Sequence, residues 1–382
     1  LGPRTELRST EFLMLPAFWK QVPSLQAALG SAAPVEGELA INGAVSSPAL
    51  KLNLAQAKNP LLDRWSLKAQ WSRARSVLDL DQFSSPLMRV SAALPLAWSD
   101  GTLQTGDVQA GIELQSFDLQ RLSALVGTPL GGTLSVRGRL DGPLEALQPN
   151  LAISLDQPRM SSIALSELWS GRLEGGVGDG AQLEMASASS FADGVLTADF
   201  AANGWPSYLW LKRGVGFLRL KGDQRGYRWD AVGLTLDGIQ VAIPTQQRFE
   251  SVGGELNGSG QLAFAPLSLN GRLTVEAPRI GALAMQKAVL EGGLQNGRFE
   301  ANAVLSPLLG SLTINAKGVV NGALNSRVDA SGLDVNWLLG LSRQLRGPVR
   351  LDGVPLGHAD DLGTLVINTF GGSLDGQLKA LI

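Results

Sequence analysis

Few side chains in this 382-residue sequence have the type and spacing that catalysis or metal binding requires. The single histidine, His358, lies in the segment GHADD at positions 357–361. A metal site needs several converging ligands, and the two aspartates of this segment point to opposite faces if it is extended. No cysteine is present, so a thiolate nucleophile, a thiolate metal site and a disulfide are excluded. We interpret the His358 segment as a solvated turn.

Two other motifs could carry chemistry, and each has a simpler structural interpretation. Asp79 and Asp81 share one face of an expected strand, where paired carboxylates could act as general acid and base. A solvated polar strand face has the same pattern, and we adopt that interpretation. The run GGVGDG at 175–180 fits neither a tandem calcium-binding nonapeptide nor a dinucleotide fingerprint, because it occurs once and an expected strand follows it at 181–185. We expect a hairpin turn there.

The composition argues against several functional classes. The net charge is −2 and the isoelectric point is about 5.6, so the chain lacks the basic surface that nucleic-acid phosphates require. Charged residues make up 17% of the chain, below the roughly 25% that is usual. The sequence therefore predicts a non-enzymatic protein with no catalytic, cofactor-binding or metal-binding residues, no cofactor and no nucleic-acid partner.

A period of two dominates the chain and predicts antiparallel strands. In the segment 130–155, Leu134 and Val136 share one strand face, while polar side chains such as Arg137 share the other. Gly, Asn, Asp and Pro separate such segments, which favours short hairpin connections. The predicted sheet is therefore apolar along one side, and glycines within its strands favour curling. The residues predicted to line this apolar surface are Leu39, Ile41, Leu50, Leu52, Leu54, Leu134, Val136, Leu140, Leu151, Ile153, Leu155, Leu269, Leu273, Val275, Leu312, Ile314, Leu365 and Ile367.

Short helical signals interrupt the strands. The segments 24–30, 118–127 and 334–347 each begin near an N-capping residue, end at glycine and lead into another strand. We interpret this recurrence as a loose internal repeat, at about 22–117, 118–252 and 253–382, within one continuous β-groove over residues 1–382. The predicted fold class is all-β: an elongated, curled antiparallel sheet with a few short interrupting helices.

The apolar stretches are too short to cross a bilayer. The longest, at 11–19 and 336–341, fall below the roughly 18–20 residues that a transmembrane helix needs. The sequence opens without methionine and without the apolar core of a signal peptide, so we expect an internal segment or a processed form of a longer protein. Most of the nine tryptophans are expected in a packed core, whereas Trp19 is a candidate for membrane or partner contact.

Three degenerate motifs resemble the AsmA/TamB family of β-rich bridge proteins. GTLSVRGRLDGPL at 132–144 and FGGSLDGQL at 370–378 resemble the repeating strands of that family. ASGLDVNWLL at 330–339 resembles the helices that interrupt the repeats in its cyanobacterial and plastid branch. The resemblance covers most of the chain, and its specificity comes from recurrence. The membrane helix and the barrel-docking segment that end a complete member have no recognised counterpart, so the sequence resembles a middle portion.

The resemblance implies a taco-shaped groove in the periplasm or intermembrane space, attached to the inner membrane through a missing N-terminal anchor. Phospholipid acyl chains would lie along the apolar residues, so the segment would carry phospholipid between inner and outer membranes and support outer-membrane biogenesis. An Omp85-type outer-membrane barrel would be a partner through the missing C-terminal region. One alternative is a scaffold or chaperone of a translocation and assembly module, which would tether that barrel and assist outer-membrane protein insertion through exposed strand edges. Another is a β-sandwich with a closed core.

Overall fold

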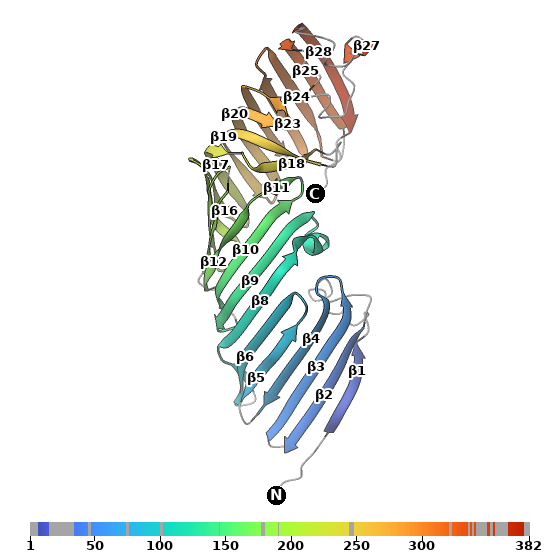
Figure 1. Ribbon diagram of the computed structural model, residues 1–382, viewed down its shortest axis with the longest axis vertical. Coiled ribbons are helices and arrows are strands. Elements are labelled where there is room, and N and C mark those ends of the chain that lie inside the picture. The colour runs from blue at the N-terminus through green and yellow to red at the C-terminus, as the bar shows by residue number, and fades with distance from the viewer. Residues whose placement is uncertain are drawn as a thin grey trace. The chain divides into compact units, whose positions relative to one another are not determined.

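The computed structural model describes residues 7–14, 34–44, 47–73, 76–99, 102–144, 146–176, 180–189, 191–243, 248–320, 323–334, 337, 340, 350–351, 354–355 and 366–377. Nearly every element within these residues is a β-strand (Figure 1). The chain divides into two compact units, which are described separately. Unit 1 comprises Leu1–Ser161, Leu168–Met185 and Asp199–Gly204, and unit 2 comprises Ser162–Glu167, Ala186–Ala198 and Trp205–Ile382. This division does not test the three loose repeats that the sequence predicts, so they remain a prediction.

The strands of unit 1 follow one another as a meander. Neighbouring strands pair antiparallel in the order β2–β3–β4–β5–β6–β8–β9–β10–β12, and β1 pairs with β2. Their bounds are β1 (Leu7–Met14), β2 (Val35–Ala44), β3 (Ser47–Asn59), β4 (Asp63–Ser72), β5 (Val77–Ser84), β6 (Met88–Ser99), β7 (Thr102–Thr105), β8 (Val108–Asp118), β9 (Leu130–Gly142), β10 (Gln148–Met160), β12 (Leu168–Gly176) and β13 (Gly180–Ser187), the last of which ends in unit 2.

Unit 2 has the same organisation. Antiparallel pairs join β15–β16–β17–β19–β20–β22–β23–β24–β25–β28 in that order. The bounds are β11 (Ile163–Leu165), β14 (Gly194–Phe200), β15 (Pro206–Arg213), β16 (Gly216–Asp223), β17 (Gly226–Thr235), β18 (Ile239–Ile243), β19 (Arg248–Phe264), β20 (Leu267–Ile280), β21 (Leu283–Ala284), β22 (Lys287–Gln295), β23 (Arg298–Ser306), β24 (Ser311–Val319), β25 (Ala323–Asp334), β26 (Arg350–Leu351), β27 (Val354–Pro355) and β28 (Val366–Gln377). The predicted antiparallel, nearly all-β fold class is confirmed.

β-Bulges recur near one end of the strands in both units. An extra residue enters β8 between Leu114 and Phe117, and similar register shifts interrupt β10 and β20. Non-glycine residues with positive φ lie at these three shifts: Ser116 (47°), Gln157 (46°) and Ala277 (48°). Because a bulge adds one residue to one strand only, side chains before and after it keep facing the same side of the sheet. The alternation along the sequence therefore shifts by one residue at each bulge, while the faces of the sheet are preserved.

One helical segment lies between β8 and β9 (Figure 1). It consists of a 3-10 turn, η1 (Leu119–Leu122), and a single helical turn, α3 (Ser123–Val126). The Asp118 side chain accepts a hydrogen bond from the backbone N–H of Gln120, and Gly127 ends the segment at φ 71°. The helix predicted at 118–127 is thus confirmed, although it is short.

The other two predicted helices are covered only in part. The segment 24–30 lies outside the described residues. Of the segment 334–347, Asp334 ends β25, and Trp337 and Gly340 are helical. Among the described residues, no helix has both the length and the apolar character that crossing a membrane demands.

Candidate functional site

Strand register places the alternating apolar residues of unit 1 on one side of its sheet, which we call the apolar face. Leu39 lies opposite Leu52, and Leu134 lies opposite Leu155. The same pairing continues from strand to strand, so that rows of apolar residues cross the sheet. One row is Leu39, Leu52, Ala69, Leu80, Ala92, Ala110 and Leu140; the next is Leu54, Leu67, Phe83, Val90, Ile112, Gly138, Leu151 and Leu173; a third is Met88, Leu114, Val136, Ile153 and Gly171.

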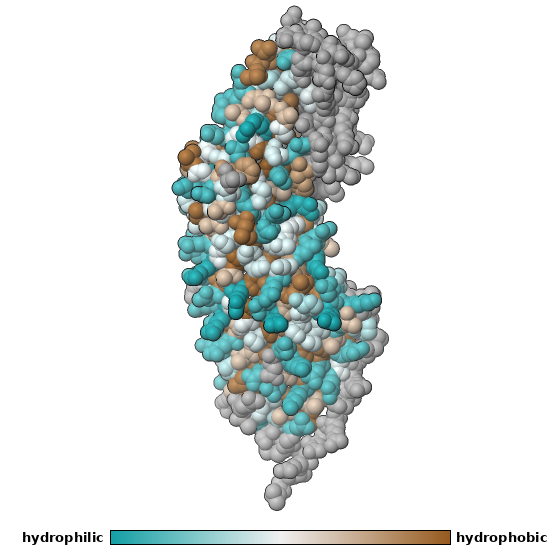
Figure 2. Space-filling model, viewed as in Figure 1, coloured by the Kyte–Doolittle hydropathy of each residue, from teal (hydrophilic) through white to brown (hydrophobic). Residues whose placement is uncertain are grey.

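The opposite side of the same sheet, its polar face, carries hydroxyl and charged side chains. Its charges alternate in sign where Glu113 lies between Arg89 and Arg137, which favours cross-strand attraction. Figure 2 shows one side of the molecule, where hydrophilic and hydrophobic residues are interspersed. It is the strand register that assigns the charged residues of this row and the aliphatic rows to different faces of the unit 1 sheet. One polar row is Ala55, Ser66, Ser84, Arg89, Glu113, Arg137, Ala152 and Arg172.

The predicted groove residues differ in how far solvent reaches them. Leu39 and Leu269 are exposed, whereas Leu312 is buried. Leu365 lies outside the described residues, and Ile367 belongs to β28, opposite Leu333. The remaining predicted residues are half-buried, so solvent still reaches part of each side chain: Ile41, Leu50, Leu52, Leu54, Leu134, Val136, Leu140, Leu151, Ile153, Leu155, Leu273, Val275 and Ile314.

One end of the strands in unit 1 is closed by a packed cluster, which we call its closed margin. The cluster contains a stacked pair, Trp65 and Phe83, whose ring centroids are 5.7 Å apart. Leu119 and Leu122 of η1 pack against it. Its side chains are excluded from water, unlike those of the neighbouring strand centres. The buried members of the closed margin are Val35, Leu61, Leu62, Trp65 and Phe117.

A buried polar network holds this margin together. The side-chain oxygen of Gln56 accepts hydrogen bonds from Trp65 Nε1 (2.7 Å) and from Asn59 Nδ2 (2.9 Å). Asn59 Oδ1 in turn accepts from the backbone N–H groups of Leu61 (2.9 Å) and Leu62 (3.1 Å). Buried polar groups need such partners to avoid a desolvation cost. The network therefore fixes the β3–β4 turn beneath the apolar cluster.

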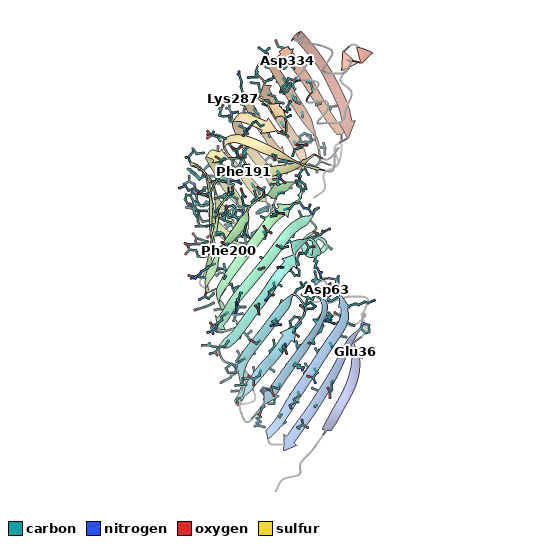
Figure 3. The ribbon with its side chains drawn as sticks, viewed as in Figure 1. Glu36, Asp63, Phe191, Phe200, Lys287 and Asp334 are labelled. Carbon is teal, nitrogen blue, oxygen red and sulfur yellow. The ribbon has the colours of Figure 1, made fainter. Side chains whose placement is uncertain are left out.

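An ion pair ties the helical segment to the same margin. Arg121 on η1 donates to the Asp63 carboxylate (2.8 Å) and to the backbone carbonyl of Leu61 (3.1 Å). The hydrogen bond to Asp63 is the main cause that raises the pKa of Arg121. Figure 3 shows Asp63 at the end of the unit 1 strands where this segment lies. The contact positions the segment over the strand ends.

The apolar face of unit 2 is built by the same register. Leu269 and Leu290 lie on it and are 44% and 45% exposed, which makes its centre more open than that of unit 1. Leu269 is among the residues predicted from the sequence and Leu290 is not, although the alternation of 288, 290, 292 and 294 identifies it. Two rows of this face are Leu211, Leu218, Ala231, Gly258, Leu273, Leu290, Ala303, Ile314 and Val328, and Tyr227, Leu262, Leu269, Leu294 and Phe299.

The ring of Trp229 lies against glycines on this face. A Cβ atom added to Gly260 would come within 2.7 Å of the Trp229 ring, and one added to Gly271 within 2.8 Å. Phe299 lies in the same way on Gly318, where an added Cβ would come within 2.6 Å of its ring. The glycines within these strands thus make room for aromatic rings, a role that alternation alone does not reveal.

A second closed margin lies at one end of the strands in unit 2. Leu312, Ala330 and Leu333 form a buried cluster, with Trp337 packed against it. The Trp337 indole N–H donates to the backbone carbonyl of Ala284 (3.1 Å). Each unit therefore combines a closed margin at its strand ends with a more accessible apolar face. We call the part of the apolar face that solvent reaches the wall.

The most deeply buried charges in the described part of the chain belong to unit 2. Arg213 donates to the Glu167 carboxylate and to the backbone carbonyl of Asp237, and both charged side chains are almost fully buried. Burial lowers the pKa of Arg213, and the negative charges of Glu167 and Asp237 act in the opposite direction. Gly238 adjoins the pair, because a Cβ added there would come within 2.9 Å of Arg213 Nη2. This pair anchors the segment that contains β11 to the end of β15.

The structure covers the motifs that suggested possible chemistry only in part. Asp79 lies opposite Gln70 and Ala93, and Asp81 falls at the β5 register shift. Among the described residues, no group of three or more His, Cys, Asp or Glu side chains could hold a metal ion. His358 lies outside those residues, so its interpretation as a solvated turn stays a prediction. The strand expected after the glycine run is confirmed as β13.

The tryptophans divide between core and wall. Trp65 and Trp169 are buried, whereas Trp205 is exposed. The half-buried group comprises Trp71, Trp210, Trp229 and Trp337. The side chains of Trp19 and Trp98 lie outside the described residues, so the membrane or partner contact expected of Trp19 stays a prediction.

Comparison with protein-family models, curated proteins and solved structures finds no match for this chain.

Proposed function

We propose that this chain is a non-enzymatic, lipid-carrying segment that holds phospholipid acyl chains on the apolar face of each unit. In the setting that the AsmA/TamB resemblance implies, it would form part of a periplasmic bridge and carry phospholipid between the inner and outer membranes. The observation that supports the proposal is the set of apolar rows that crosses successive strands while remaining partly open to solvent.

Acyl chains match this surface physically. An acyl chain gains free energy from burial of apolar area, at roughly 25 cal/mol per Å², without any directed polar contact. An acyl chain that covers the exposed side chains of unit 2, such as Leu269 and Leu290, would gain this free energy by removing them from water. Because the wall is made of many similar Leu, Ile and Val contacts, a chain could shift along it with little change in energy. A carrier needs that property, whereas a storage site would favour one deep pocket.

The test introduces one carboxylate on the apolar face and one on the polar face of the sheet in each unit. In unit 1, Ile153→Asp places a charge on the apolar face, and Ala152→Asp places the same charge on the polar face beside Arg137 and Arg172. In unit 2, Leu290→Asp and Asn315→Asp form the corresponding pair. Each purified variant is examined for folding by circular dichroism and for bound lipid by mass spectrometry.

We expect phospholipid to copurify with the wild type and with the polar-face variants. The apolar-face variants should remain folded and bind at least about tenfold less lipid than the wild type, because a carboxylate buried against hydrocarbon is strongly disfavoured. Folded, lipid-free wild-type protein that takes up no phospholipid from vesicles would contradict the proposal. Equal lipid content in the variants of both faces would contradict it as well.

A further inference from the structure

An unusual row of side chains lies on the polar face of unit 2 and is independent of the apolar wall. Lys221 on β16 lies directly opposite Arg228 on β17, and both are exposed. Like charges directly opposite each other in an antiparallel pair repel. The row continues to Gln261 on β19 and Asn270 on β20, whose amides supply further N–H donors. Four successive strands thus present cations or amides and no carboxylate.

The carboxylates nearest to this row are already engaged. Asp230 accepts two hydrogen bonds from Arg219, at 2.9 and 3.1 Å. Asp223 accepts one from the backbone N–H of Arg225, at 2.7 Å. Within the part of the chain that the structure describes, neither Lys221 nor Arg228 makes an ion pair. Neither cation is therefore held in a direct ion pair with an acid, as Arg219 is with Asp230.

The row lies in a hollow of about 550 Å³. This volume falls in the range of roughly 300–1,000 Å³ that is usual for small-ligand sites. Three cations of the lining face one carboxylate, that of Asp223, in a chain whose net charge is −2. The hollow is thus a local positive site on a weakly acidic protein. Its polar lining includes Lys221, Arg225, Arg228, Gln261, Ser268 and Asn270.

We infer that this hollow binds a phosphate-bearing ligand, with the phosphate group between Lys221 and Arg228. A phosphate has several acceptor oxygens, and it suits a planar guanidinium together with a compact ammonium. Its charge would relieve the repulsion across the β16–β17 ladder, and the amides of Gln261 and Asn270 are placed to donate to the rest of the ligand. The phosphate can come from a soluble ester or from a phospholipid headgroup at a membrane surface.

The test neutralises the two cations together. The double variant Lys221→Gln/Arg228→Gln is compared with Lys51→Gln/Arg137→Gln, which removes the same two residue types from the polar face of unit 1. Glycerol 3-phosphate is titrated into each protein by calorimetry, and binding is also measured to vesicles of phosphatidylglycerol and of phosphatidylcholine. Melting temperatures are recorded with and without glycerol 3-phosphate, since a ligand that binds the folded state raises them.

Wild type and the unit 1 control should bind glycerol 3-phosphate or phosphatidylglycerol vesicles, and added salt should weaken that binding. The Lys221→Gln/Arg228→Gln variant should bind at least about tenfold more weakly, while melting without ligand at or above the wild-type temperature because the repulsion is gone. Binding of phosphatidylglycerol vesicles alone would identify the lipid headgroup as the source of the phosphate. If the wild type binds neither probe, or if both double variants lose binding equally, the inference is wrong.

Discussion

The closed margin and the open wall of unit 2 belong to one run of paired strands, yet their side chains differ greatly in burial. Leu333 and Leu312, at the margin, are 0% and 4% exposed, whereas Leu269 and Leu290, on the wall, are 44% and 45% exposed. Leu312, Leu269 and Leu290 all continue the apolar side of an alternating strand pattern. What differs is that Trp337 packs across the margin. Alternation therefore determines which way a side chain faces, and the elements at the strand ends determine how deeply it is buried.

Unit 1 repeats this division with different residues. Trp65 and Phe117 are buried at its margin, where η1 packs over the strand ends, and Leu39 on its wall is exposed. Burial of apolar area is the main favourable term in folding, so the margins should carry a disproportionate share of the stability. The walls contribute less to folding and retain apolar area for a ligand. This division makes predictions of very different size for the two regions.

The largest difference is expected between Trp65→Ala and Leu269→Ala. Loss of the buried Trp65 ring creates a cavity and removes a hydrogen bond to Gln56, so the free energy of unfolding should fall by about 3–5 kcal/mol. Leu269→Ala should cost no more than about 1 kcal/mol, because much of that side chain is already in water. Urea titrations followed by circular dichroism measure both values. Equal losses would show that margin and wall do not differ in this way.

The buried Glu167–Arg213 ion pair of unit 2 predicts a loss of similar size away from the closed margin. Glu167→Gln removes the carboxylate that pairs directly with the buried guanidinium of Arg213 and should cost about 3 kcal/mol, since breaking a buried ion pair leaves one charge without its partner. The double variant Glu167→Leu/Arg213→Met removes both charges and should recover most of that loss. A double variant that is less stable than Glu167→Gln would contradict the explanation.

The polar network of the unit 1 margin predicts a smaller effect. Asn59→Ala removes the acceptor of two backbone N–H groups in the β3–β4 turn, so stability should fall by roughly 1–2 kcal/mol. Asn42→Ala, at an exposed position near the other end of β2, is the matched control and should change stability by less than about 0.5 kcal/mol. The difference between the melting temperatures of the two variants measures how much the network stabilises the protein. Equal melting temperatures would show that the network does not stabilise the margin.

The bulges predict the smallest effect, and one of opposite sign. Ser116 has a φ of 47°, a strained value for a side chain with a Cβ, so Ser116→Gly should leave stability unchanged or raise it by up to about 1 kcal/mol. Ser154→Gly, in the regular part of β10, should instead destabilise by roughly 0.5–1 kcal/mol. Chemical denaturation of both variants provides the comparison. A clear loss of stability in Ser116→Gly would contradict the role given to the bulge.

The sequence was sufficient for the fold class and for the direction of many side chains. The alternation in 130–155 predicts β9 and β10 and the pairing of Leu134 with the strand that carries Ile153 and Leu155. It failed to identify the wall residues of β5 to β8, such as Leu80 and Ile112. A register shift interrupts each of β5 and β8, so a strict period of two breaks there although the face is preserved.

Burial could not be predicted from the sequence, because it depends on contacts between distant segments. Leu312 and Leu269 have similar strand contexts, and only the packing of residues near 333–337 distinguishes them. The Glu167–Arg213 pair joins residues 46 positions apart, with no motif around either. Trp65 and Trp229 both alternate with polar neighbours, yet the first lies in a core and the second lies on glycines of the wall.

The absence of cysteine allows acyl-chain contact to be measured one position at a time. Single cysteines at Ile153 and Leu290, on the apolar faces, and at Ala152 and Asn315, on the polar faces, are labelled with a fluorophore. Each protein is then mixed with phospholipid that carries a nitroxide on its acyl chain. Lipid held on the apolar faces predicts strong quenching at 153 and 290 and little at 152 and 315. Quenching of the same size on both faces, or none at 153 and 290, would contradict it.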